Sequence, residues 1–191
     1  MKDIKIKSIH QDIDKEKEQV NQILIDETTK YGFSVRVENI NSQEEVAIYT
    51  LNKSTLSDYI PILENFSFDI ESEFYYILEQ KKLKIYCRKY TINYDNNMDM
   101  SNKRKNIKAV LEYVLGKQIP NTKLNSLSML AGLSPLEIGV LHTVQTYANQ
   151  LLLDITNSAI TKALIKYSSI AKLFVEYFDM KFNPDYKNNK K

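Results

Sequence analysis

The sequence predicts an α+β protein in which an antiparallel sheet with helices is followed by an all-helical segment. Three observations indicate this. Residues 1–94 combine helical patterns with β-branched and aromatic runs that alternate in polarity. Residues 101–184 instead repeat apolar residues at helical spacing. Between them, residues 94–100 have turn composition and no apolar period, so we place a domain boundary there.

Two helices and five strands are expected in the first domain. The helices are residues 12–30, which end before Gly32, and residues 55–66, where Pro61 either delays the start or distorts the first turn. The strands are residues 4–10, 33–38, 46–49, 68–78 and 83–92. The order strand, helix, strand, strand, helix, strand, strand fits a ferredoxin-like sandwich in which helices cover one face of an antiparallel sheet.

The second domain is expected to be a compact helical bundle. Its clearest helix start is Ser134, which provides an N-cap oxygen, with Pro135 in the first turn and Glu137 completing a capping box. The expected helices are residues 102–116, 124–131, 135–152, a helix from Asp154 or Thr156 to Lys166, and a last one from Ser168. The Lys- and Asn-rich residues 185–191 are expected to form a disordered tail.

The composition is that of an ordinary globular chain. It has 191 residues, 43% of them hydrophobic, and a net charge of +2 with the two signs interspersed, which disfavours a nucleic-acid partner. The single cysteine, Cys87, lies in an apolar-rich run and is expected to be a buried thiol in a reducing compartment. Neither a signal peptide nor an apolar run long enough for a membrane span is apparent, so we expect a cytoplasmic protein without a membrane partner.

The residue types that carry catalysis or bind cofactors are poorly represented. The four glycines never form the Gly-x-Gly pattern of a dinucleotide site, and a Walker loop is also missing. The two histidines, His10 and His142, are too far apart in the sequence for a helical metal pair. We interpret His142 as a partly exposed residue on a bundle helix.

Acidic and aromatic clusters are also interpreted structurally. The pairs Glu44-Glu45 and Glu71-x-Glu73 lie in turn or strand contexts, where solvated charges are commoner than acid catalysts. Five tyrosines could suggest a platform for stacking bases, but without a basic stripe we interpret them as packing residues of the sheet: Tyr75, Tyr76, Tyr86, Tyr90 and Tyr94. We therefore assign no catalytic, no cofactor-binding and no metal-binding residue.

Three segments, in this order, resemble the large, multi-domain class of bacterial NAD-specific glutamate dehydrogenase. Residues 56–66 are similar to its Leu-Ser-Asp-x-Leu-Pro-x-Leu-Glu-Asn pattern. Residues 131–150 resemble its Ala-Gly-Leu-Ser helix, and residues 170–184 its Ile-Ala-x-x-Leu-Val element ending in Phe-x-Pro. Three positions depart from the family pattern, since Ser67 replaces a usual glycine, and His142 and Lys181 replace usual arginines.

The resemblance implies a region upstream of the catalytic core, an ACT-like domain followed by helices. The family's substrate loop with its catalytic lysine, its catalytic aspartate and its dinucleotide-binding fold have no counterpart here. We therefore expect a non-catalytic regulatory or assembly fragment, inactive alone and without its own cofactor. The parent enzyme would bind NAD and convert L-glutamate to 2-oxoglutarate and ammonia.

Expected partners are the other domains of the parent polypeptide, further subunits of a homo-oligomer and, at an ACT-like interface, an amino-acid effector. A fragment of a larger protein should also expose apolar surface where its neighbours would pack. The alternative is an autonomous ligand-sensing or protein–protein interaction module without enzymatic activity.

Overall fold

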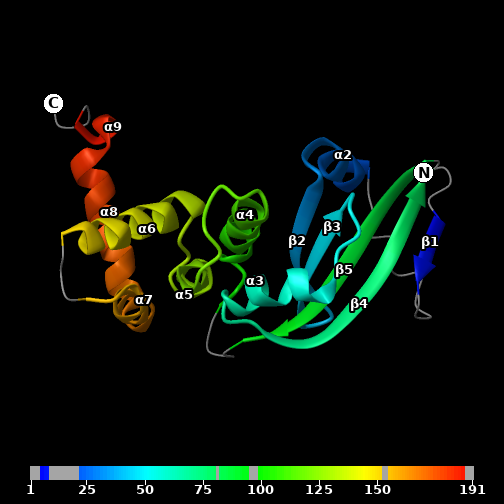
Figure 1. Cartoon of the computed structure of the whole chain (residues 1–191), viewed down its shortest axis with the longest axis horizontal. Coiled ribbons are helices and arrows are strands. Elements are labelled where there is room, and N and C mark those ends of the chain that lie inside the picture. The colour runs from blue at the N-terminus through cyan, green and yellow to red at the C-terminus, as the bar shows by residue number, and fades with distance from the viewer. Residues whose placement is uncertain (1–4, 9–21, 81, 95–98, 152–154, 188–191) are drawn as a thin grey trace. The chain divides into compact units, whose positions relative to one another are not determined.

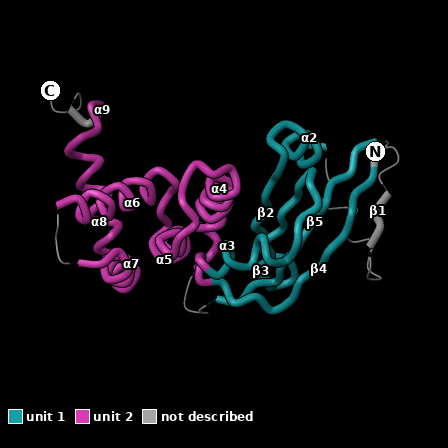
Figure 2. The backbone as a smooth tube through the Cα atoms, in the orientation of Figure 1, with its two compact units in different colours: residues 1–64, 68–97 teal, residues 65–67, 98–191 magenta. Residues whose placement is uncertain are grey.

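A computed structural model describes residues 5–8, 22–80, 82–94, 99–151 and 155–187. The chain divides into two compact units (Figure 2). Unit 1 comprises residues 1–64 and 68–97, and unit 2 comprises residues 65–67 and 98–191. Each unit is described by itself.

Unit 1 is built on an antiparallel sheet with the strand order β1-β4-β5-β3-β2 (Figure 1). Its strands are β1 Lys5–Ser8, β2 Phe33–Ile40, β3 Gln43–Thr50, β4 Asp69–Gln80 and β5 Leu83–Asn93. Its helices are α2 Gln22–Tyr31, the 3₁₀ helix η1 Leu56–Asp58 and α3 Ile60–Glu64. The α+β class is confirmed, and these elements follow the predicted order along the chain. Residues 12–21 of the first expected helix lie outside the described residues.

The hairpin between β2 and β3 is closed by a two-residue turn. Asn41 and Ser42 both have positive φ, 52° and 65°. Two successive positive φ values are typical of a type I′ turn, whose twist matches that of the flanking strands. The turn sets the register from Ile40 opposite Gln43 to Phe33 opposite Thr50.

Pro61 delays the helix that was expected over residues 55–66. The chain first forms η1, where the Thr55 backbone N–H donates to the Asp58 carboxylate at 2.6 Å. Helix α3 then begins at Ile60, so Pro61 lies in its first turn, where a missing N–H breaks no helical hydrogen bond.

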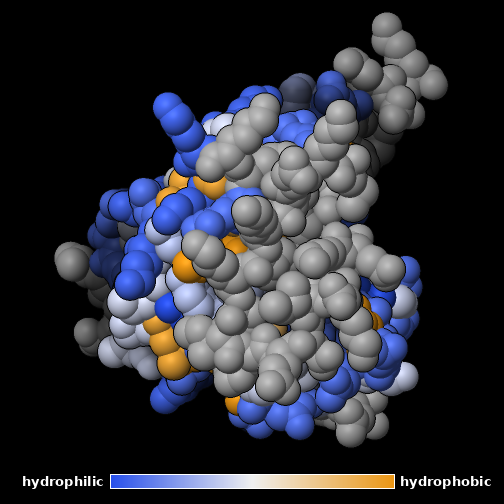
Figure 3. Space-filling view, turned by 90° about the vertical axis from the view of Figure 1, so that its right-hand side faces the viewer, coloured by the Kyte–Doolittle hydropathy of each residue, from blue (hydrophilic) through white to orange (hydrophobic). Residues whose placement is uncertain are grey.

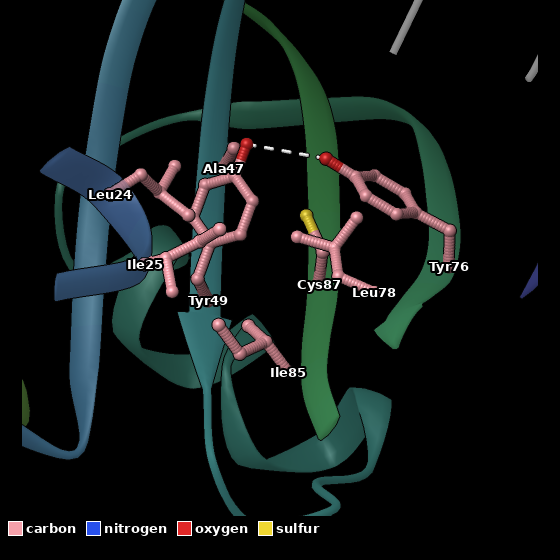
Figure 4. Packing of buried hydrophobic residues seen from close by; sticks show 8 residues of the cluster. All are labelled: Leu24, Ile25, Ala47, Tyr49, Tyr76, Leu78, Ile85 and Cys87. Atoms are coloured by element: carbon pink, nitrogen blue, oxygen red, sulfur yellow. Dashed lines mark hydrogen bonds between the residues drawn. The ribbon is translucent and has the colours of Figure 1, made fainter. Parts of the chain in front are cut away.

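The core beneath α2 is mainly hydrocarbon with a few buried polar groups (Figure 4). Its members come from α2 and the three central strands: Leu24, Ile25, Ala47, Tyr49, Tyr76, Leu78, Ile85 and Cys87. The Tyr76 hydroxyl donates to the Tyr49 hydroxyl at 3.2 Å, and the two rings meet edge to face. Because burial disfavours the charged phenolate, the pKa values of both tyrosines are raised well above their ordinary value.

The α2 helix and the segment leading into η1 lie on opposite faces of the sheet. Cys87 belongs to the cluster beneath α2, whereas the next residue of β5, Arg88, donates to the Ser54 carbonyl at 2.7 Å. Successive strand residues point to opposite faces. The sequence analysis expected the helices to cover one face, but the polar anchor at Arg88 holds the η1 end on the other face.

Unit 2 is helical throughout its described part. Its elements are α4 Arg104–Leu115, the 3₁₀ helix η2 Lys123–Ser126, α5 Leu127–Leu130, α6 Pro135–Gln150, α7 Asn157–Lys166, α8 Ser168–Phe182 and α9 Pro184–Lys187. Its largest set of buried side chains comes from α4, η2, α5, α6 and the connection between α5 and α6: Ile107, Val110, Leu111, Val114, Leu124, Leu127, Met129, Leu133, Ile138 and Leu141. Short joints connect these helices, as the sequence analysis expected.

The ends of these helices agree with the sequence except at α4. Ser134 and Glu137 form the predicted capping box, in which the Ser134 N–H donates to the Glu137 carboxylate at 2.7 Å. At the end of α4, Gly116 has a negative φ, and Lys117 adopts the left-handed conformation with φ of 56°. Gly116 was expected to end the helix. The residue with the left-handed conformation is instead Lys117, one position later, whose Cβ atom disfavours that conformation.

Residues 185–187 of the expected disordered tail are instead helical, in α9 Pro184–Lys187, and residues 188–191 lie outside the described residues. Within the described part of the chain, every helix is too short or too polar to cross a bilayer. Among the residues that Figure 3 colours by hydropathy, most of the visible surface is hydrophilic, with small separate hydrophobic patches.

Candidate functional site

Helix α8 carries more apolar surface than unit 2 covers. Its inner side contributes Ala171 and Val175 to the interior. The opposite side leaves four large apolar side chains in solvent, which we call the outer α8 face: Ile170 61%, Leu173 63%, Phe174 40% and Tyr177 58% exposed. The spacing i, i+3, i+4, i+7 places these four residues on one stripe. Such a stripe normally faces a partner or a core.

A groove runs along α6 and consists of two adjoining cavities. The larger, of about 800 Å³, lies between α6 and α8. The smaller, of about 540 Å³, lies mainly between α6 and the end of α4 with the segment after it (Tyr113 and residues 118–120), and Phe178 is its contribution from α8. Both are lined by Leu136, Val140 and Phe178. We call the two together the α6–α8 groove. Volumes of this size fall within the range of ordinary ligand and peptide pockets.

The local sequence explains why apolar side chains line this groove. The capping box fixes the start of α6, and residues four apart, Leu136 and Val140, then share one side of that helix. On α8 the i, i+4 pair of Phe178 and Phe182 contributes two rings whose centroids lie 4.7 Å apart. These residues form apolar walls from both helices.

His142 lies on α6 at the edge of the smaller cavity. Its Nε2 lies 3.1 Å from the Thr122 hydroxyl, and partial burial lowers its pKa by disfavouring the charged ring. The interpretation as a histidine on a bundle helix agrees with this placement. His10 lies outside the described residues.

The two carboxylates of each acid pair have different surroundings in the described structure. Glu44 accepts a hydrogen bond from Asn39 at 2.8 Å, and Glu45 lies 3.4 Å from the Lys89 ammonium. Glu73 pairs with Arg88, whereas Glu71 is exposed. Glu44 and Glu45 are neighbours on β3, so the alternation of the strand places them on opposite faces of the sheet. Glu71 and Glu73 are separated by the bulge of β4 between Ile70 and Ser72.

The tyrosines are mainly packing residues, as interpreted from the sequence. Tyr76 and Tyr90 are fully buried, so neither presents a ring to a base in solvent. Tyr75 and Tyr86 are half-buried. Cys87 is a buried free thiol, as expected.

The sequence analysis missed a polar cluster around Arg88. The guanidinium pairs with Glu73, stacks over the Tyr75 ring at 4.7 Å from its centroid and donates to the Ser54 carbonyl. Its Nε is buried with no hydrogen-bond partner among the described residues. The pairing of β4 with β5 brings these groups together, and no local sequence pattern reveals that register. The cluster joins β4, β5 and the η1 approach on one face of unit 1.

Among the described residues, no cluster of three or more histidine, cysteine or acidic side chains could hold a metal ion. The feature that most resembles a binding site is therefore apolar, and it lies on α6 and α8. The described residues thus form a protein of the α+β class. Its helical unit presents a groove and an exposed apolar helix face.

A comparison with known families relates that helical unit to one enzyme. Residues 119–184 match the family model described as glutamate dehydrogenase, helical motif 3, over about a third of the chain. The match includes α6 and α8, and with them the larger cavity and the outer α8 face, whereas Tyr113 and Gln118 of the smaller cavity lie outside it. It contains two of the three segments on which the sequence resemblance rests, and residues 56–66 lie outside it. No curated protein matches the chain.

Proposed function

We propose that this chain is a non-catalytic assembly and regulatory region of a large NAD-specific glutamate dehydrogenase. The parent enzyme would oxidise L-glutamate to 2-oxoglutarate and ammonia in the cytoplasm, with NAD bound in a separate catalytic domain. The family match over residues 119–184 and the order of the three resembling segments support this proposal.

The observation that carries the assembly role is the outer α8 face. It lies inside the matched residues, and its four large apolar side chains remain in solvent. Burial of one such side chain is worth about 1.5–3 kcal/mol, so a partner that covers the stripe gains substantial free energy. A second subunit or a neighbouring domain of the same polypeptide would supply that cover.

The proposal for unit 1 is an ACT-like regulatory domain with an amino-acid effector. Its support is the succession α2, β2, β3, α3, β4, β5 on an antiparallel sheet with the order β4-β5-β3-β2. This strand order is the one that a ferredoxin-like sandwich would have if its first strand were moved to the end of the chain, but α2 and η1 lie on opposite faces here, whereas that sandwich has its helices on one face. Thermal-shift titration with the common amino acids tests the effector, because a ligand of the folded state raises the melting temperature.

Sedimentation velocity tests the assembly role. We expect wild-type chain to associate reversibly with rising concentration, and the double variant Leu173→Glu with Tyr177→Glu to remain monomeric, because charges would replace the apolar stripe. Ile23→Glu with Leu56→Glu is the matched control, since it places two charges at other exposed apolar residues. A wild-type chain that is monomeric at all concentrations, or an equal effect of the control, would contradict self-assembly through α8.

Assays for glutamate-dependent reduction of NAD test the non-catalytic role. We expect no turnover from the chain alone, and measurable turnover would overturn this part of the proposal.

A further inference from the structure

The larger cavity of the α6–α8 groove has an acidic rim. Three carboxylates line it, those of Glu137, Glu176 and Asp179, and its lining within the described part of the chain includes no lysine, arginine or histidine. The chain as a whole carries a net charge of +2, whereas the described lining of the larger cavity is negatively charged. A concave site with charges of one sign attracts partners of the other.

These three carboxylates form no ion pair recorded among the described residues. Glu137 accepts from the Ser134 N–H in the capping box, and Asp179 accepts from the Asn183 side-chain amide at 3.1 Å. Neither partner carries a formal positive charge, although the N-terminal backbone of α6 offsets part of the charge of Glu137. Glu176 and Asp179 therefore supply most of the negative potential that meets an incoming cation.

The floor and walls between these charges are apolar and adaptable. Leu136 is 74% exposed although it lines both cavities, and Met180 and Phe182 are also exposed. Methionine and aromatic side chains suit a surface that adjusts to a docked helix. The α6 residues that line the groove run from Pro135 to Val144, a length of about 14 Å at the rise of an α-helix, or roughly two and a half turns of a docked helix.

We propose that the α6–α8 groove binds an amphipathic helix of a protein partner, with apolar anchors on one face and lysines or arginines beside them. The anchors contact Leu136, Val140 and Phe178, and the cations face Glu176 and Asp179. This binding goes beyond the proposed assembly role, because none of the four residues of the outer α8 face lines the groove.

Peptide binding followed by fluorescence tests the proposal directly. The chain contains no tryptophan, so a single tryptophan in the peptide reports only on the peptide. The probe is an amphipathic peptide of leucine and lysine, about 18 residues or five helical turns long, with its leucines on one face. Its controls are the same pattern with glutamate in place of lysine, and the leucine–lysine composition in a scrambled order without an apolar face.

We expect the patterned lysine peptide to bind with a blue shift of its fluorescence, and both control peptides to bind at least about tenfold more weakly. Equal binding of the glutamate peptide would show that charge does not select the partner. Equal binding of the scrambled peptide would show that no helix face is recognised. Absence of binding by the patterned lysine peptide would also overturn the proposal.

Two pairs of variants locate the binding site. Glu176→Lys with Asp179→Lys should weaken the lysine peptide about tenfold, whereas Glu38→Lys with Glu64→Lys makes the same change in net charge on exposed residues of unit 1 and should leave binding unchanged. Leu136→Ser should also weaken binding, whereas Leu173→Ser on the outer α8 face should not.

Circular dichroism melting curves establish that all these variants fold. Equal losses from a groove variant and its control would place the peptide elsewhere and overturn the assignment. Failure of self-association would leave this assignment intact, because Leu173 and Tyr177 lie outside the groove.

Discussion

Helices α4 and α8 both carry apolar residues at helical spacing, yet the fold uses them differently. Helix α4 buries Ile107, Val110, Leu111 and Val114 within unit 2. Helix α8 is the longer and the more apolar of the two, but its buried residues are only Ala171 and Val175. The comparison shows that an apolar stripe indicates a need for a partner surface and does not say whether the same unit supplies that surface.

A matched pair of leucine truncations gives the largest expected contrast. Leu111→Ala removes a fully buried side chain and should lower the free energy of unfolding by about 3 kcal/mol. Leu173→Ala should change it by no more than about 0.5 kcal/mol, because the side chain is already in solvent. Urea unfolding followed by far-ultraviolet circular dichroism measures both. Similar losses at the two positions would mean that the outer α8 face is packed.

The attachment of α7 to α6 is the next test, because α7 connects the well-packed helices to α8. The Gln145 amide donates to the Asn157 carbonyl and to the Thr161 hydroxyl, both at 2.7 Å. Gln145→Leu should cost about 1–2 kcal/mol, since both acceptors lose a buried donor. Hydrogen exchange of the α7 amides should quicken, and Gln150→Leu at the exposed end of α6 should leave it unchanged. Unaltered exchange in the Gln145 variant would contradict this attachment.

The end of α4 offers a smaller and stabilising change. Lys117→Gly should raise the free energy of unfolding by about 0.5–1 kcal/mol, because glycine adopts a φ of 56° without the steric cost of a Cβ atom. Lys105→Gly, within α4, should instead lower stability by about 1 kcal/mol through helix propensity. Thermal melts compare the two variants. Destabilisation by both would show that Lys117 is not held in the left-handed region.

The smallest effect concerns pH and His142 on α6, the helix that contacts both α4 and α8. Burial lowers the pKa of His142 in the folded chain, so the unfolded chain binds this proton more readily. The contribution is fully present above the unfolded pKa and is lost as pH falls through the folded one. Urea midpoints should therefore decline between about pH 7 and about pH 5, and His142→Gln should flatten that part of the profile. An identical profile in the variant would contradict the shift.

Much of the fold could be predicted because short local sequence patterns specify its elements. The alternation of β2 and β3, the turn at Asn41 and Ser42, and the capping box at Ser134 are specified by residues near each other in the sequence. Pro61 predicted either a delayed start or a distorted first turn, and the structure shows the delayed start of α3. The type and order of the elements were therefore accessible.

Features set by contacts distant in sequence were not accessible. The Arg88 cluster needs the register of β4 against β5, and the two-sided sheet needs the anchor at Ser54. The acidic rim unites Glu137 with Glu176 and Asp179 from a different helix. The sequence did indicate the apolar stripe of α8, but only the packing of α6 and α7 shows which part of it stays in solvent.

Ser67 illustrates how a departure from the family pattern can be explained by conformation. Its φ is 62°, in the left-handed region where glycine, the usual residue of the pattern, is favoured. The backbone thus keeps the shape that the glycine would allow, at some steric cost.

The edge-to-face pair of Tyr49 and Tyr76 gives unit 1 an optical signal of its own. With no tryptophan in the chain, near-ultraviolet dichroism comes mainly from tyrosines held in asymmetric surroundings, and this buried pair is held by a mutual hydrogen bond. Tyr147, Tyr167 and Tyr177 of unit 2 are exposed and contribute little. Loss of the near-ultraviolet band of this tyrosine pair on heating therefore reports the melting of the sheet in unit 1. The far-ultraviolet signal reports the helices separately.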